Sequence, residues 1–253
     1  MNHSGHDVGL LLERWEGVIE KQRWEKTIIA ERGGFPILCL RNRAALEFDA
    51  RGAYLSTGVH GDECAPPWAL LRWAESISRE TALQPLTIFP CLNPVGVIEN
   101  TRVDGEGVDL NREFHDSSHP LLGAWQKSIA DRCFDVSVHL HEDYDTAGIY
   151  LYELSRSRSW GDSYLSACEE LIPRENSAMV DGSEFENGLL FHDEDENEIR
   201  RVVAEELGGG MPEAIYLYLE HTDRSYTFET PSECDLELRI RTHQRFLEAV
   251  VGK

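Results

Sequence analysis

Short apolar runs alternate with stretches of helical spacing along most of this chain of 253 residues. Two apolar runs joined at Gly33-Gly34 predict a β-hairpin over 27–40. The stretch 93–118 reads as a long loop. The other segments that read as strands are 52–59, 85–92, 134–141, 148–154 and 214–221. Helices are predicted at 65–78, 121–133 and 232–251. The last of these begins at Ser232, a residue type suited to an N-cap.

This alternation predicts an α/β fold with a central mixed, mostly parallel β-sheet flanked by helices. Apolar residues make up 41% of the chain, which is enough for a sizeable core. No repeat, low-complexity linker or change of composition divides the sequence, so we expect one domain over residues 1–253. In sheets of this kind, sites form at the carboxyl ends of the strands.

The charge and the apolar pattern exclude several classes of partner. The formal net charge is −22, whereas nucleic acids and anionic membrane surfaces require clusters of basic residues. No stretch is long and apolar enough to cross a bilayer, and the first residues lack the pattern of a signal peptide, so we expect a cytoplasmic location. Six cysteines lie far apart without a CxxC pair, which predicts reduced thiols. The oligomeric state is not predicted.

Two histidines share one face of the strand predicted at 134–141. Apolar and polar residues alternate strictly there, so His139 and His141 point the same way, about 6.6 Å apart at about 3.3 Å per residue. Zinc–nitrogen bonds are only about 2.0–2.1 Å long, so both cannot easily bind one ion. His141 is nearer the carboxyl end, and we favour it as a ligand. His139 is then expected to hold a ligand or its neighbour in place.

A second candidate pair lies in the sequence HGDE, where a predicted strand gives way to a proline-led helix. Taken alone, His60 and Glu63 are most simply a polar turn that closes the strand. Together with His141 they supply two histidines and a carboxylate at the carboxyl ends of strands. A catalytic zinc ion requires such a set of three ligands, with its fourth position left for water.

These motifs occur in an order that resembles the zinc carboxypeptidase superfamily. The superfamily includes carboxypeptidase A, succinylglutamate desuccinylase and aspartoacylase, and the chain looks most like its compact single-domain bacterial members. The resemblance runs from residue 60 to residue 229 and rests on the ordered set. Its members are HGDE at 60–63, NPVG at 93–96, Arg102, DLNREF at 109–114, HLHED at 139–143 and YTFE at 226–229.

The resemblance implies that His60, Glu63 and His141 hold one zinc ion. Many relatives have an aspartate two residues before the third ligand, whereas this chain has His139. Carboxypeptidase A also covers its substrate with a tyrosine, and this chain offers several candidates for it. They are Tyr144, Tyr216, Tyr218 and Tyr226.

The resemblance also gives two arginines a role. It implies that Arg102 polarises the scissile carbonyl, and that Asn111 and Arg112 hold a carboxylate of the substrate. The planar fork of an arginine suits a carboxylate because it makes two parallel charge-assisted bonds. Each arginine could instead form a structural ion pair. Arg102 could pair with Asp104, and Arg112 could pair with Glu106, Asp109 or Glu113.

Two glutamates are candidates for the general base. Glu220 ends the apolar run at 214–221, read here as a strand, and the strand-end rule alone slightly prefers it. The family's TFE motif favours Glu229. A carboxylate beside an activated water can take its proton and pass it to the leaving nitrogen.

The function expected from these residues is zinc-dependent hydrolysis of an amide bond next to a free carboxylate, in a small peptide or an N-acyl amino acid. A metallocarboxypeptidase-like enzyme is preferred, because the chain ends in one amphipathic helix soon after Glu229, as single-domain carboxypeptidases do. The alternatives are a deacylase of N-acyl amino acids, an amidase for murein-derived peptides, and a zinc-containing binding module without turnover.

Overall fold

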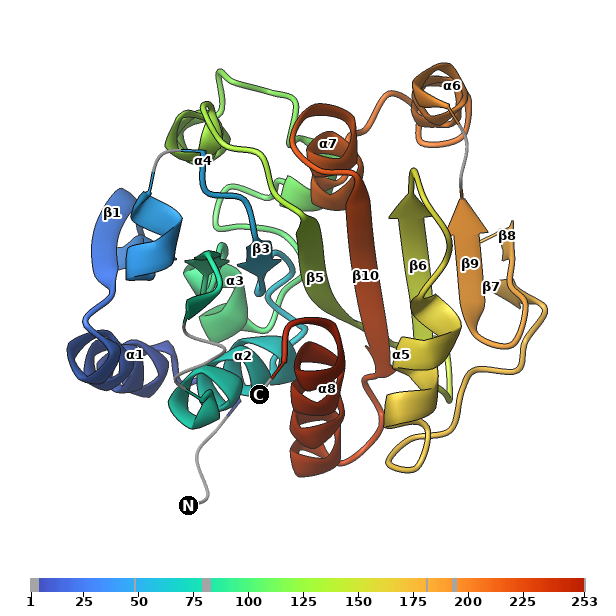
Figure 1. The fold of residues 1–253 in the computed structure, drawn as a ribbon, viewed down its shortest axis with the longest axis horizontal. Helices are drawn as coiled ribbons and strands as arrows, with labels where there is room; N and C mark the ends of the chain where they lie inside the picture. The colour runs from blue at the N-terminus through green and yellow to red at the C-terminus, as the bar shows by residue number, and fades with distance from the viewer. Residues whose placement is uncertain (1–4, 48, 79–82, 181, 193–194, 253) are drawn as a thin grey trace.

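The computed structural model describes residues 5–47, 49–78, 83–180, 182–192 and 195–252. Its centre is a mixed eight-stranded β-sheet (Figure 1). Four neighbouring pairs are parallel, namely β3–β4, β3–β5, β5–β10 and β6–β9, and the others are antiparallel. In order across the sheet, the strands are β1 (Glu25–Arg32), β2 (Phe35–Arg41), β4 (Leu86–Phe89), β3 (Ala53–Ser56), β5 (Val136–Asp143), β10 (Arg224–Pro231), β6 (Tyr150–Ser155) and β9 (Leu189–His192).

Helices pack on both faces of this sheet, so the predicted α/β class is confirmed. One face carries α1 (Val8–Gln22), α2 (Ala65–Ser76), α5 (Gly161–Cys168) and α8 (Leu236–Val250). The other face carries α4 (Pro120–Ile129) and α7 (Glu213–Glu220). The remaining α-helices and strands are α3 (Pro94–Glu99), α6 (Glu196–Glu205), and the short pair β7 (Met179–Val180) and β8 (Ser183–Glu184). In the described ranges, no helix has the length and apolar character needed to cross a membrane.

The hairpin and the strand–turn–helix segment form where the sequence predicts them. β1 and β2 pair in antiparallel register around the turn at Gly33-Gly34, both of which have positive φ. β3 leads through a buried turn into α2, whose Pro66 and Pro67 occupy the first helical turn, where the missing N–H groups cost nothing.

The segment 214–221 is a helix, so its prediction as a strand is wrong. Pro212 precedes the first residue of α7 and sets the entry into the helix. The buried side chains Glu213, Leu217 and Tyr218 recur at helical spacing. The central strand is instead β10, which follows a few residues later and lies between β5 and β6. An apolar run of this length does not distinguish the two structures by periodicity alone.

Two smaller expectations also need correction. Asp235, not Ser232, caps α8: its carboxylate accepts hydrogen bonds from the backbone of Glu237 and Leu238. The stretch 93–118 is not entirely a loop, because it contains α3 and a 3₁₀ turn over Leu110–Arg112. The six cysteines are free, as predicted, and four of them are buried.

A buried ion pair joins β5 to the helices on the α8 face. Arg239 of α8 lies 2.6 Å from Glu142, whose side chain is fully buried. Glu142 also accepts a hydrogen bond from the backbone of Ala65, the first residue of α2. Burial raises the pKa of Glu142 to about 7, although Arg239 opposes this change. The pair therefore fixes α2 and α8 against the strand that carries His141.

Replacing Arg239 should cost much more stability than replacing a partly exposed arginine between helices. Arg239→Leu leaves the Glu142 carboxylate buried without its cation, which lowers the free energy of unfolding by about 3–5 kcal/mol. Arg72→Leu is the matched control, because Arg72 of α2 pairs with the half-exposed Glu237 of α8 and its loss costs at most about 1 kcal/mol. Urea denaturation monitored by circular dichroism measures the free energy of unfolding of both variants. Equal decreases in the two variants would contradict this account.

Candidate metal centre

The carboxyl ends of two adjacent parallel strands bring three candidate ligands together. His60 and Glu63 lie in the turn after β3, and His141 lies on β5, which pairs with β3. All three side chains are buried. Each offers one ligand atom, and these atoms lie within 4.8 Å of one another. Among the described residues this is the one group of three or more such side chains close enough to share an ion.

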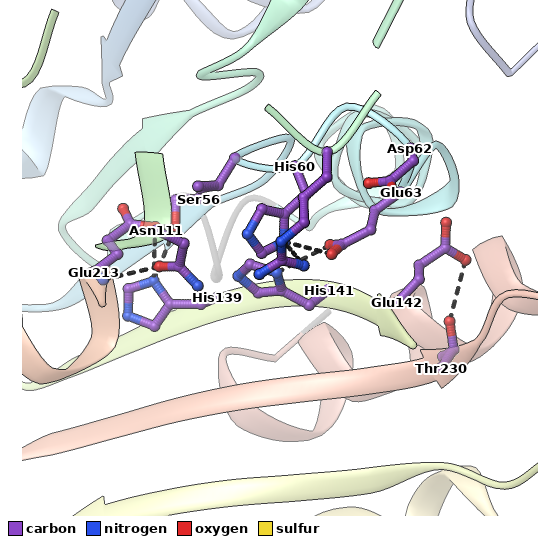
Figure 2. A network of polar contacts seen from close by, with 12 residues as sticks. Ser56, His60, Asp62, Glu63, Asn111, His139, His141, Glu142, Glu213 and Thr230 are labelled. Carbon is purple, nitrogen blue, oxygen red and sulfur yellow. Dashed lines mark hydrogen bonds and ion pairs between the residues drawn. The ribbon is translucent and has the colours of Figure 1, made fainter. Parts of the chain in front are cut away.

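The carboxylate of Glu63 contacts both histidines (Figure 2). Its Oε1 is 2.5 Å from His60 Nδ1, and its Oε2 is 2.9 Å from His141 Nδ1. Burial alone would raise the pKa of Glu63, but the two histidines outweigh it and hold this pKa well below its usual range. Burial would likewise lower the pKa of His60, but Glu63 and Asp109 raise it to about 9. The cluster therefore favours positive charge at its centre.

Asp109 orients His60 from the other side, and the sequence reasoning did not assign it this contact. Its Oδ1 lies 3.2 Å from His60 Nε2, and its Oδ2 accepts a hydrogen bond from Arg102 Nε. Burial would raise the pKa of Asp109, but His60 and Arg102 keep it low. A histidine whose outer nitrogen meets a carboxylate presents its inner nitrogen to a metal in a fixed orientation. The place of Asp109 in the DLNREF motif was the available signal.

Gly61 explains why the HGDE turn lies so close to α3 and to the segment that follows it. A Cβ at this position would collide with the backbone of Gly96. The Gly61 N–H also donates to the carbonyl of Thr101 at 3.0 Å. The glycine therefore lets the turn with His60 pack directly against the segment that carries Arg102.

The donor set fits a zinc ion. Two imidazole nitrogens and one carboxylate oxygen are a common set of ligands for a catalytic zinc, and a second carboxylate oriented behind one histidine is its usual support. No cysteine belongs to the cluster, in contrast to most structural zinc sites.

His139 shares the sheet face with His141, as predicted, but it contacts a different set of side chains. Its Nδ1 lies 3.0 Å from Ser56 Oγ and 3.1 Å from Glu213 Oε2, while its Nε2 lies 3.1 Å from Ser137 Oγ. His139 is buried within this polar network beside the cluster, and none of these three partners is a candidate ligand.

Arg102 lies at the edge of the cluster. Its Nη1 is 3.4 Å from His60 Nδ1. Its side chain is 45% exposed, so the guanidinium contacts both the cluster and the solvent. Arg102 pairs with Asp109 at 3.0 Å. Asp104, the structural partner considered from the sequence, instead accepts hydrogen bonds from the backbone of its own turn.

Asn111 and Arg112 form the 3₁₀ turn that follows Asp109, and both are partly buried. Asn111 Oδ1 accepts a hydrogen bond from the backbone N–H of Glu213 at 3.0 Å. Arg112 Nη1 donates to the carbonyl of Asn111. Among the ion pairs of the described ranges, none includes Arg112; Glu106 pairs with Arg32 instead.

Of the two candidate bases, only Glu229 lies beside the cluster. It is the register partner of His141 across the parallel pair β5–β10, so both side chains point to the same face. Glu229 is only 9% exposed, and its charge contributes to a raised pKa at His141. Glu220 ends α7 and forms an exposed ion pair with Arg200.

The four candidate tyrosines lie in different surroundings. Tyr144 is half-exposed at the end of β5, and its hydroxyl donates to the carbonyl of Asp62 at 2.7 Å, next to Glu63. Tyr218 and Tyr226 are fully buried, and Tyr216 packs against the ring of Trp125. Of the four, Tyr144 is the one that the structure places at the rim of the cluster.

Comparison with known proteins agrees with this geometry. Residues 49–147 match the family model of the succinylglutamate desuccinylase/aspartoacylase catalytic domain. This segment contains His60, Glu63 and His141, and it ends before Glu229. No curated protein sequence matches the chain.

Several solved structures have the same fold. A candidate metallopeptidase from Shewanella amazonensis is 21% identical, with a TM-score of 0.81 over 98% of this chain and 95% of that one. A metallo-carboxypeptidase from Pseudomonas aeruginosa is 17% identical, with a TM-score of 0.60 over 94% and 68%. Bovine thrombin-activatable fibrinolysis inhibitor is 14% identical, with a TM-score of 0.63 over 99% and 96%. The shared fold and the matched segment confirm that the chain resembles the zinc carboxypeptidase superfamily.

Proposed function

We propose that this protein is a zinc-dependent hydrolase that cleaves an amide bond next to a free carboxylate, in the manner of a metallocarboxypeptidase. The observation that carries the proposal is the convergence of His60, Glu63 and His141 at one edge of the sheet, with Glu229 on the neighbouring strand. Three buried ligands beside a nearly buried carboxylate are the arrangement that metal-assisted hydrolysis requires.

A zinc ion held by the three ligands would lower the pKa of a water molecule to about 7 and polarise a carbonyl group. Glu229 is the base that takes the proton of the attacking water and delivers it to the leaving nitrogen. Its position opposite His141, on the same face of the sheet, supports this role. The low exposure of Glu229 also keeps bulk water from competing for the proton.

Arg102 stabilises the negative charge that develops on the carbonyl oxygen. Its guanidinium lies at the edge of the cluster, is oriented by Asp109, and keeps a face toward solvent from which a substrate can approach. Asn111 and Arg112 bind the free carboxylate. The Pseudomonas aeruginosa structure holds (2-guanidinoethylmercapto)succinic acid, a dicarboxylic acid, which supports carboxylate recognition in this fold.

A deacylase of N-acyl amino acids is the second candidate. The observation that favours it is the match of residues 49–147 to a catalytic domain of desuccinylases and aspartoacylases. Both candidates use the same metal centre, base and carboxylate-binding residues. They differ in the group on the other side of the cleaved bond, a peptide in one case and a simple acyl group in the other.

Replacing the base should abolish turnover and leave the metal in place. Glu229→Gln keeps the shape of the side chain but cannot accept the proton of water, so kcat should fall by about 10²- to 10⁴-fold. Zinc content, measured by mass spectrometry of the purified protein, should equal that of the wild type. Glu220→Gln is the matched control and should retain full activity, because Glu220 lies on the surface. If Glu220→Gln loses turnover while Glu229→Gln retains it, Glu220 and not Glu229 is the general base.

Arg112→Ala should discriminate between substrates by their carboxylate. For peptides or N-acyl amino acids with a free carboxylate, kcat/KM should fall by about 10- to 100-fold, since one charged hydrogen bond contributes roughly 1.5–3 kcal/mol. Hydrolysis of the matching C-terminal amides should change little, and zinc content should stay the same. If Arg112 serves only to hold its loop, both substrate classes lose activity equally and the thermal midpoint of unfolding falls.

A further inference from the structure

The segment that leads into α7 holds the turn that carries Asn111 and Arg112. Met211 N–H donates to the carbonyl of Arg112 at 2.7 Å, and Phe114 N–H donates to the carbonyl of Met211 at 3.1 Å. Glu213, the first residue of α7, adds the bond from its backbone N–H to Asn111 Oδ1. Three hydrogen bonds therefore fix this turn against the start of the helix.

The last of these bonds determines which end of the Asn111 amide faces the cluster. A backbone N–H can only donate, so the atom that meets it must be the carbonyl oxygen of the side chain. Figure 2 shows this oxygen on the side of Glu213 and the amide nitrogen toward the histidines of β5. Asn111 therefore presents N–H groups, which are donors, on the side of the metal cluster.

The carboxylate of Glu213 anchors the backbone N–H of the same residue in the core. Its side chain is fully buried and accepts hydrogen bonds from the hydroxyl groups of Tyr54 and Ser56, the latter at 2.9 Å. His139 Nδ1 lies 3.1 Å from the same carboxylate. Trp125 in turn donates to the hydroxyl of Tyr54. The first turn of α7 is thus tied to β3, β5 and α4.

We propose that Glu213 is a positioning residue that makes Asn111 a donor toward the substrate, and thereby selects a carboxylate over a carboxamide. The proposal rests on the proposed function, in which Asn111 binds the carboxylate of the substrate. A carboxylate only accepts hydrogen bonds, so it pairs with the outward N–H groups. His139 then acts through Glu213: it supports the carboxylate that holds this helix end.

Two variants at one position isolate the backbone bond. Glu213→Ala and Glu213→Pro both remove the carboxylate, but only proline removes the N–H. Proline fits the first residue of α7, because helices accept it there and Pro212 has φ −61° and ψ 151°, a conformation allowed before proline. The comparison of the two therefore measures the contribution of the N–H that orients Asn111.

The readout is binding to the zinc-loaded protein in the Glu229→Gln background, measured by calorimetry. The probes are N-benzoyl dipeptides, each as the free acid and as the C-terminal amide. The wild-type sequence at position 213 should prefer the acids. The ratio of the Kd for the amide to the Kd for the acid should fall about 10-fold further in Glu213→Pro than in Glu213→Ala. This difference corresponds to the loss of one oriented charged hydrogen bond.

Asn111→Asp keeps the proposal testable if either variant fails to fold. Aspartate still accepts the bond from Glu213, but it replaces the outward nitrogen by an oxygen, so the preference should invert toward the amides. Retention of the preference for acids in Asn111→Asp, or equal effects of Glu213→Ala and Glu213→Pro, would overturn the role of Glu213. Absence of any preference in the unaltered site would instead overturn the proposed function, and the inference with it.

Discussion

The parallel pairing of β5 with β3 on one side and β10 on the other is the constraint on which the site depends. The pairing with β3 brings the turn that carries His60 and Glu63 beside His141. The pairing with β10 places Glu229 opposite His141. Three segments that are distant in sequence thus deliver two histidines and two carboxylates to one edge of the sheet. The other face of β5 supports this arrangement through the buried pair of Glu142 and Arg239.

Electrostatics explains why this edge suits a cation. Glu63 and Asp109 contact His60 from opposite sides, and both carboxyl groups have pKa values held below their usual range. The burial of His60 and Glu63 limits the screening of their charges by water. A divalent ion would meet the Glu63 carboxylate and the imidazoles of His60 and His141, whose ligand atoms already lie within 4.8 Å of one another. Arg102 adds positive charge only at the edge, where the proposed reaction develops negative charge.

The sequence predicts the parts of the site that depend on strand alternation and strand ends. The strict alternation at 134–141 correctly puts His139 and His141 on one face, and the turn after β3 brings His60 and Glu63 to its carboxyl end. The sequence fails where a short apolar run has no decisive period. The run at 214–221 predicts a strand where α7 forms, so the sequence does not reveal β10, and Glu220 stands as a serious candidate for the base. For the same reason the sequence does not single out Glu213, which is buried only because it begins the helix α7.

The most direct test of this account is a crystal structure of the zinc-loaded protein with anomalous diffraction recorded at the zinc absorption edge. The account predicts one strong anomalous peak, bonded to His60, Glu63 and His141 at about 2.0–2.2 Å. His139 should remain outside bonding distance, in contact with Glu213. A peak at another place, or an ion bonded to His139 with His141 turned away, would contradict the central claim.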